Sequence, residues 1–274
     1  MKKKLFHLLM AVILLCLVVL FVFPLYLAIM NSLKPLGDIL GNTLALPTSF
    51  FLDSYQYVFV EMNYLNAFIN TFMITAISVI FIVILGSMCA YKLSRTNDRK
   101  SQIIMMLLFS SMIIPFQTIM LPLSKVAKAM NLTDSIPGLI LMVIPLFAPF
   151  AIFMYHGFVK NVPIEVEEAA QIDGCSAFGI FFKIVFPMLK PITGSVIVLD
   201  VLWVWNDFAL PLIMLQSKQN KTITITIYTF FSSVQMRWDY ALSGLMLSSL
   251  PVLIFFIFMQ RFIIKGVISG AVKG

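Results

Sequence analysis

Six long apolar stretches constrain this sequence more than any other feature. A helix needs roughly 20 apolar residues to cross the hydrocarbon core of a bilayer. Hydrophobic residues make up 61% of the 274 residues and charged residues only 11%, with a mean hydropathy of +1.00, so a water-soluble globule is excluded. We therefore predict an all-α membrane protein with a single transmembrane domain over 1–274. Its six transmembrane helices are predicted at 5–30, 66–91, 103–123, 138–158, 184–214 (too long for one span) and 240–264.

Basic residues predict the orientation of these helices. Most of the 19 Lys and Arg residues lie at the N-terminus, in 92–100, in 160–190 and in the tail, which fall on one side of a six-span topology. Because positive flanks are retained in the cytoplasm, both termini are predicted to be cytoplasmic. The net charge of +7 is scattered between apolar runs, so it indicates contact with the lipid membrane and no nucleic acid. The first run is too long for a cleaved signal peptide and is interpreted as an anchor.

The sequence offers no catalytic or metal site. Its three Cys and two His residues have neither a disulfide framework nor metal-ligand spacing. A phosphate-binding P-loop needs Gly-Lys followed by Ser or Thr, and no Gly of this chain precedes a Lys. We expect no enzyme activity and no bound cofactor, so any ATP must be hydrolysed by another subunit.

A polar segment at 160–187 interrupts the apolar pattern. Pro163 and the acidic residues that follow it favour the start of a helix, and Gly174 supplies a helix stop. After this break Phe178, Phe181, Phe182 and Val185 recur at helical spacing, which predicts one apolar stripe packed against the membrane domain. Pro187 is expected to end or bend the second helix. Taken alone, such a segment is an amphipathic connector between two spans.

The spacing within this segment resembles a known signature. Glu168-Ala169-Ala170, Gly174, Ile184 and Pro187 match the EAA signature of ATP-binding cassette (ABC) importer permeases, and Asp173 matches the fuller form seen in sugar importers. Cys175 and Phe186 depart from it as apolar replacements for Ala and Leu. The resemblance implies the type I ABC importer permease fold and a cytoplasmic coupling loop at 160–187. It assigns contact with an ATPase subunit to Glu167, Glu168, Ala169, Ala170, Asp173, Gly174, Ile184 and Pro187.

Two further motifs resemble the carbohydrate-uptake branch, close to the smaller permease of maltose-type importers. They are Trp205-Asn206-Asp207-Phe208 with Pro211-Leu212, and the chain ending. By this resemblance Gly270, Lys273 and Gly274 of the tail (265–274) contact the ATPases, and the loop 216–239 contacts a solute-binding protein. It also implies a distinct second permease subunit, two ATPases that use ATP and Mg, an extracellular or periplasmic solute-binding protein, and a bacterial or archaeal cell membrane.

One acidic residue falls inside the fifth predicted span. Asp200, Trp203 and Asp207 are predicted to share a helical face, with Asn206 beside them. A carboxylate at the bilayer centre is costly unless it meets a partner or an aqueous path, whereas near the headgroups it costs little. Two interpretations of these four residues are therefore possible: they line the pathway or contact another subunit, or they simply lie near the headgroups. Trp203 and Trp205 also suit an interfacial anchor.

Prolines and an alternating Thr/Ile segment predict local features of the chain, and three alternative functions are considered beside a sugar permease. Prolines 115, 122, 145 and 149 are expected to interrupt the third and fourth spans, and alternating Thr and Ile at 222–227 predicts a short strand. The alternatives to a sugar permease are a permease for a polyol or glycerol phosphate, an ion-coupled secondary transporter, and a scaffold without transport. The secondary transporter requires paired intramembrane charges, of which Asp200 is the one good candidate, and the scaffold leaves the EAA spacing unexplained.

Overall fold

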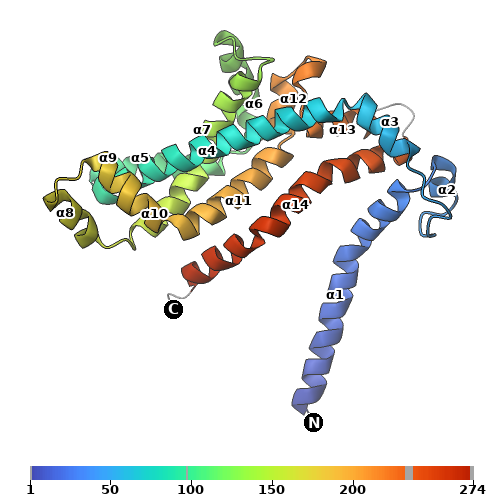
Figure 1. Cartoon of the computed structure of the whole chain (residues 1–274), viewed down its shortest axis with the longest axis horizontal. Helices are drawn as coiled ribbons and strands as arrows, with labels where there is room; N and C mark the ends of the chain where they lie inside the picture. The colour runs from blue at the N-terminus through green and yellow to red at the C-terminus, as the bar shows by residue number, and fades with distance from the viewer. Residues whose placement is uncertain (1, 97, 232–236, 272–274) are drawn as a thin grey trace. The chain divides into compact units, whose positions relative to one another are not determined.

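The chain folds into helices joined by short connections (Figure 1). The computed structural model describes residues 2–96, 98–231 and 237–271, and no strand occurs among them. The helices form two compact units: a first unit of Met1–Leu65 with Thr226–Pro251, and a second unit of Asn66–Ile225 with Val252–Gly274. The predicted all-α fold class is confirmed.

Among the described residues, four helices are long and apolar enough to cross a membrane: α1 (Lys2–Ser32), α4 (Tyr64–Thr96), α7 (Ile136–Val159) and α14 (Trp238–Ala271). Two bent pairs of helices are long and apolar enough when each pair is taken together. One pair is α5 (Arg99–Ile113) with α6 (Phe116–Ala129), and the other is Ala177–Met188 with α11 (Lys190–Asn206). The six predicted spans thus correspond to four helices and two bent pairs.

The third predicted span is broken in the structure. Helices α5 and α6 meet at an angle of 106°, and the break lies at Ile114 and Pro115. Ile114 is extended (φ −71°, ψ 120°) because the ring of a following proline disfavours helical geometry. The same expectation was wrong for Pro122, which lies inside α6, and for Pro145 and Pro149, which lie inside an uninterrupted α7. Helices tolerate prolines in a bilayer when neighbouring groups satisfy the freed carbonyls.

The fifth apolar run is overlong because it contains more than one helix. A short helical segment ends at Met188, the chain turns by 78°, and α11 then runs to Asn206. A further helix, α12 (Ala209–Met214), follows. The prediction of a strand at 222–227 was wrong, since these residues open α13 (Ile223–Phe231). A strand is stable only when paired, and no second strand among the described residues offers a ladder.

The second unit has an apolar core made of two clusters of buried side chains. One cluster joins α4, α7, α11 and the segment before α11, and includes Ile82, Tyr155, Val185 and Val196, all fully buried. A second cluster joins the other end of α4 to α6, α7 and α12. Helices α7 and α11 lie side by side (Figure 1). Close packing of this kind transmits displacement from one helix to the next.

The first unit packs two short helices, α2 (Leu36–Gly41) and α3 (Asp53–Glu61), with the first turns of α14. Tyr57 stacks on Tyr240 with ring centroids 4.2 Å apart, and the Ser243 hydroxyl donates to the Ser32 carbonyl over 3.1 Å. The most apolar window of α1 has none of its residues buried. Such a surface is suited to contact with lipid.

Candidate coupling segment

We call residues 160–187 the coupling segment. It opens with helix α8 (Ile164–Ile172), and Pro163 stands directly before the first turn with φ −59° and ψ 130°. Glu165 and Glu167 lie in that turn, where negative charge complements the unpaired amides of a helix N-terminus. The predicted helix start is confirmed within one residue.

Helix α8 ends at the predicted glycine. The Gly174 amide donates to the Gln171 carbonyl and the Cys175 amide to the Ala170 carbonyl, both over 3.0 Å. These two bonds form a Schellman motif, which requires a left-handed residue at its centre. Gly174 supplies it with φ +82°. A Cβ built on Gly174 meets no atom within 4 Å, so the requirement for glycine is one of backbone conformation alone.

A second helical stretch follows the break. The Ser176 hydroxyl accepts from the Gly179 amide and caps α9 (Ala177–Ile180), which continues through a π-helical turn, Phe181–Val185, into α10 (Phe186–Met188). The chain then bends into α11 next to Pro187, as predicted.

The predicted aromatic stripe is only partly correct. Phe181 and Val185 are buried, but Phe178 is 67% and Phe182 is 43% exposed. The π turn at Phe181–Val185 explains part of the difference, because its wider spacing rotates side chains away from the positions expected in an α-helix. Ile184 and Phe186 pack partly buried against the core, and Pro187 is also partly buried.

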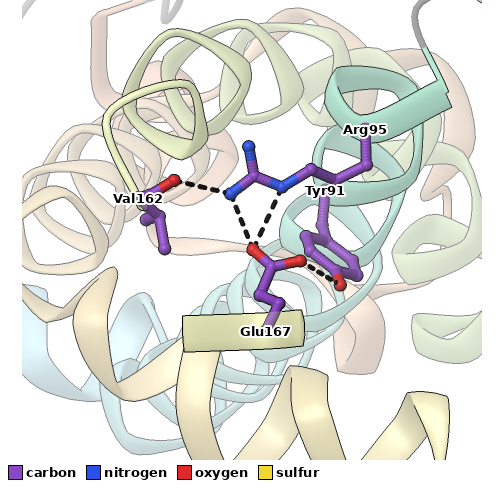
Figure 2. A network of polar contacts seen from close by, with 4 residues as sticks. All are labelled: Tyr91, Arg95, Val162 and Glu167. Carbon is purple, nitrogen blue, oxygen red and sulfur yellow. Dashed lines mark hydrogen bonds and ion pairs between the residues drawn. The ribbon is translucent and has the colours of Figure 1, made fainter. Parts of the chain in front are cut away.

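Four residues, from α4, α8 and the connection before α8, hold α8 against the membrane domain (Figure 2). Arg95 at the end of α4 donates from Nε and Nη2 to Glu167 Oε1, over 3.0 and 2.6 Å. Its Nη2 also donates to the Val162 carbonyl over 2.8 Å. Tyr91, one turn earlier on α4, donates its hydroxyl to Glu167 Oε2 over 2.7 Å. Both carboxylate oxygens of Glu167 are therefore satisfied, and we call these four residues the anchor network.

Burial strengthens the anchor network. The side chains of Arg95 and Glu167 are 20% and 9% exposed. Water screens such a pair much less than a surface ion pair, and removing one partner leaves an uncompensated charge. The ring of Tyr91 also lies 5.4 Å from that of Phe181, so α4 contacts both halves of the coupling segment.

Helix α8 has an inward and an outward face. Glu167 and Ala170 are buried against the membrane domain, whereas Glu168, Ala169, Asp173 and Gly174 are exposed. Ile172, on the outward face, is 87% exposed. Ile164 and Val166 of the same helix are also exposed, at 48% and 41%. Several exposed apolar side chains on one short helix are typical of a surface that contacts another protein.

Sequence reasoning missed three residues of this site. Tyr91 was considered only as the end of the second predicted span, and Arg95 only as one of the basic residues that set the orientation. Their four-residue spacing, however, places them on one helix face. That spacing was the available signal. Ile172 carried no signal, because its exposure depends on how α8 docks.

The structure separates the predicted pathway residues. Asp200 is fully buried in α11, Trp203 is 42% exposed with its ring 4.6 Å from that of Phe150, and Asp207 lies beyond the last residue of the helix. The predicted shared face was therefore wrong for Asp207, whereas Asp200 and Trp203 lie three residues apart on α11. Asn206 is exposed and donates its side-chain amide to the Leu202 carbonyl. Within the described residues, neither carboxylate oxygen of Asp200 has a hydrogen-bond partner.

A polar network joins two loops at the other end of the second unit. Asp134 Oδ1 accepts from the amides of Gln216 and Ser217, each over 3.0 Å, and Oδ2 accepts from the Ser217 hydroxyl. Hydrogen bonds from Ser217 hold the pKa of the Asp134 carboxyl well below its usual range. The Asn70 side chain donates to the Gln219 carbonyl over 2.7 Å, which fixes the same loop to α4.

The predicted tail contacts are mostly beyond what the structure describes. Helix α14 continues to Ala271 and contains Gly270, so the helix is longer than the predicted span. Lys273 and Gly274 lie outside the described residues.

Comparisons with known proteins agree over most of the chain. Residues 82–269 match the model of a family described as "Binding-protein-dependent transport system inner membrane component". The matched region includes the whole coupling segment and all four residues of its anchor network.

Two named relatives are similar over nearly their full length. The chain is 39% identical over 255 residues to the "Probable starch degradation products transport system permease protein AmyC" of Thermoanaerobacterium thermosulfurigenes, covering 93% of this chain and 92% of that protein. It is 32% identical to the melibiose/raffinose/stachyose import permease protein MelC of Bacillus subtilis, covering 92% and 91%. A chain of a bacterial ABC transporter that imports alginate has the same fold, with a TM-score of 0.83, 18% identity and coverage of 95% and 97%.

Proposed function

Since this chain belongs to the family of binding-protein-dependent transport system inner membrane components, we propose that it is a permease subunit of an ATP-driven oligosaccharide importer. It is a multi-pass membrane protein that hydrolyses no ATP itself and works with ATPase and solute-binding partners. The observation that carries the mechanism is the two-faced helix α8, anchored by Glu167 on one side and displaying Ile172 on the other.

The geometry explains how force passes through the coupling segment. An ATPase that moves the outward face of α8 also moves Arg95 and Tyr91, because Glu167 is bonded to both. Phe181 and Val185 carry the same movement into the core that contains α11. Closure of two ATPases on ATP and Mg would thus shift the spans as rigid bodies, which is alternating access.

The partners we propose beyond the family level are a second, distinct permease chain, two copies of an ATPase and an extracellular or periplasmic solute-binding protein. Residues 216–239, which Asp134 binds through the Gln216 amide and Asn70 through the Gln219 carbonyl, are the surface we assign to the solute-binding protein. The tail, Gly270 with Lys273 and Gly274, is assigned to the ATPases. We place the assembly in the cell membrane of a bacterium or archaeon.

Oligosaccharides are the substrate class we assign, because the two named relatives are called permeases for starch degradation products and for melibiose, raffinose and stachyose. We further assign Asp200 a place at the translocation pathway. A buried carboxylate with no partner in the described chain is costly, and exposure to water or to sugar hydroxyls during transport would relieve that cost.

A reconstituted importer tests this function. Proteoliposomes that contain this chain, its partner permease, the ATPases and the binding protein are expected to accumulate labelled raffinose or maltotriose only when ATP is present. Glycerol 3-phosphate at equal concentration is the matched control and should not be accumulated. Uptake driven by an ion gradient without ATP would contradict the proposal in favour of a secondary transporter.

A further inference from the structure

A groove of about 680 Å³ lies between α4, α5 and α7 in the second unit, outside the anchor network. Polar side chains line one end of it: Ser94, Gln102, His156 and Lys160. They come from the end of α4, the start of α5 and the end of α7, so three helix ends meet there.

The other end of the groove is apolar. Met105, Met106, Phe109 and Ile113 follow Gln102 along one face of α5 at three- and four-residue spacing. From Gln102 to Ile113 this face extends about 16 Å, which is close to the hydrocarbon depth of one leaflet. Methionine side chains are flexible and adapt to irregular apolar ligands such as acyl chains.

We propose that this groove binds an anionic phospholipid, with the phosphate between Lys160 and His156 and one acyl chain along α5. The groove is amphipathic along its length in the way that a lipid is. A basic group at the polar end and methylene-lined walls beyond it satisfy both parts of such a molecule at once.

Charge at the polar end favours an anion. Lys160 is exposed and forms no ion pair in the described structure. Further basic residues are close in sequence to Leu93 and Ser101 of the groove: Lys92, Arg99 and Lys100. The carboxylate of Asp98 accepts from the Ser101 amide and caps α5. A cluster of basic residues at the end of membrane helices is the usual site for an anionic headgroup.

One lining atom also lacks a partner. The Oγ of Ser94 is shielded from solvent and makes no hydrogen bond within the described residues. It lies one residue before Arg95 of the anchor network, so a headgroup bound here would be next to the residue that holds α8. Lipid binding at this groove is independent of which sugar the importer transports.

Native mass spectrometry of the purified, assembled importer tests the proposal. Phosphatidylglycerol and phosphatidylcholine with identical acyl chains are titrated, and we expect the anionic lipid to bind at least about fivefold better. The double variant Lys160→Gln with His156→Gln should remove this preference. Lys125→Gln, an equal loss of lysine charge on α6 outside the groove, should leave it unchanged.

A second variant tests the contribution of the apolar part of the groove to lipid binding, separately from that of the basic residues. Ser110→Trp fills the groove beside Phe109 and should lower binding of both lipids several-fold. Equal lipid preference in the Lys160/His156 and Lys125 variants would overturn the proposal. So would full competition by glycerol phosphate, which indicates a free-anion site, or cross-linking of Met106 to the partner permease in place of lipid.

Discussion

Replacing Arg95 with alanine is expected to lower coupled uptake at least tenfold while the chain still inserts into the membrane. The change leaves Glu167 buried without its cation and removes the donor to the Val162 carbonyl. Breaking a buried ion pair by deleting one partner costs about 3–5 kcal/mol. Helix α8 should then detach from α4, so movement of the ATPase no longer reaches the spans. The measurement is sugar uptake per ATP hydrolysed in proteoliposomes.

Matched variants separate the ion pair from general damage. Arg95→Lys keeps the charge but loses the fork of donors that reaches both Glu167 and Val162, so uptake should be intermediate. A double-mutant cycle with Glu167→Gln should give a large coupling energy, measured as faster hydrogen exchange of the α8 amides. The exposed neighbour Glu168→Gln should leave that exchange unchanged. Normal uptake and protected α8 amides in Arg95→Ala would contradict this role.

Gly174→Val is expected to uncouple ATP hydrolysis from uptake. Gly174 has φ +82°, a conformation that costs an L-residue about 1–2 kcal/mol and a β-branched residue more. No atom lies within 4 Å of an added Cβ, so a loss of uptake would come from the backbone conformation at the end of α8 and not from a steric clash. We expect substrate-stimulated ATP hydrolysis to lose its dependence on the binding protein, and uptake to fall about tenfold.

A series at this position provides the control. Uptake should decrease in the order Gly, Asn, Ala, Val, because asparagine adopts the left-handed conformation most readily among non-glycine residues. Equal uptake for Asn and Val would show that the Schellman motif does not matter for coupling. All variants are compared at equal amounts of membrane-inserted chain.

Much of this fold could be predicted because lipid imposes simple length and polarity rules. Apolar runs predicted the segments that form four long helices and two bent pairs. Pro163 and the acidic residues after it predicted the start of α8, and Gly174 predicted its end. The break at Ile114 and the uninterrupted α7 could not be distinguished beforehand, since both contain prolines. Whether a proline breaks a helix depends on tertiary contacts that satisfy its carbonyls.

The faces of the coupling segment were harder to predict than its existence. Glu167 and Glu168 are adjacent in sequence, yet one is buried against Arg95 and the other is exposed. Only the position of α8 against α4 decides this. Asp200 and Trp203 lie about 60° apart around α11, so the packing of that helix decides that Asp200 is buried and Trp203 is partly exposed.

The central claim is that the outward face of α8 contacts the ATPase while its inward face holds the membrane domain. Site-specific photocross-linking in the assembled importer measures this directly, with the photoreactive residue placed at Ile172 in one variant and at Glu167 in another. We expect the residue at position 172 to cross-link to the ATPase subunit and the residue at position 167 to cross-link to its own chain. Cross-links from position 172 to lipid or to the binding protein, with none to the ATPase, would contradict it.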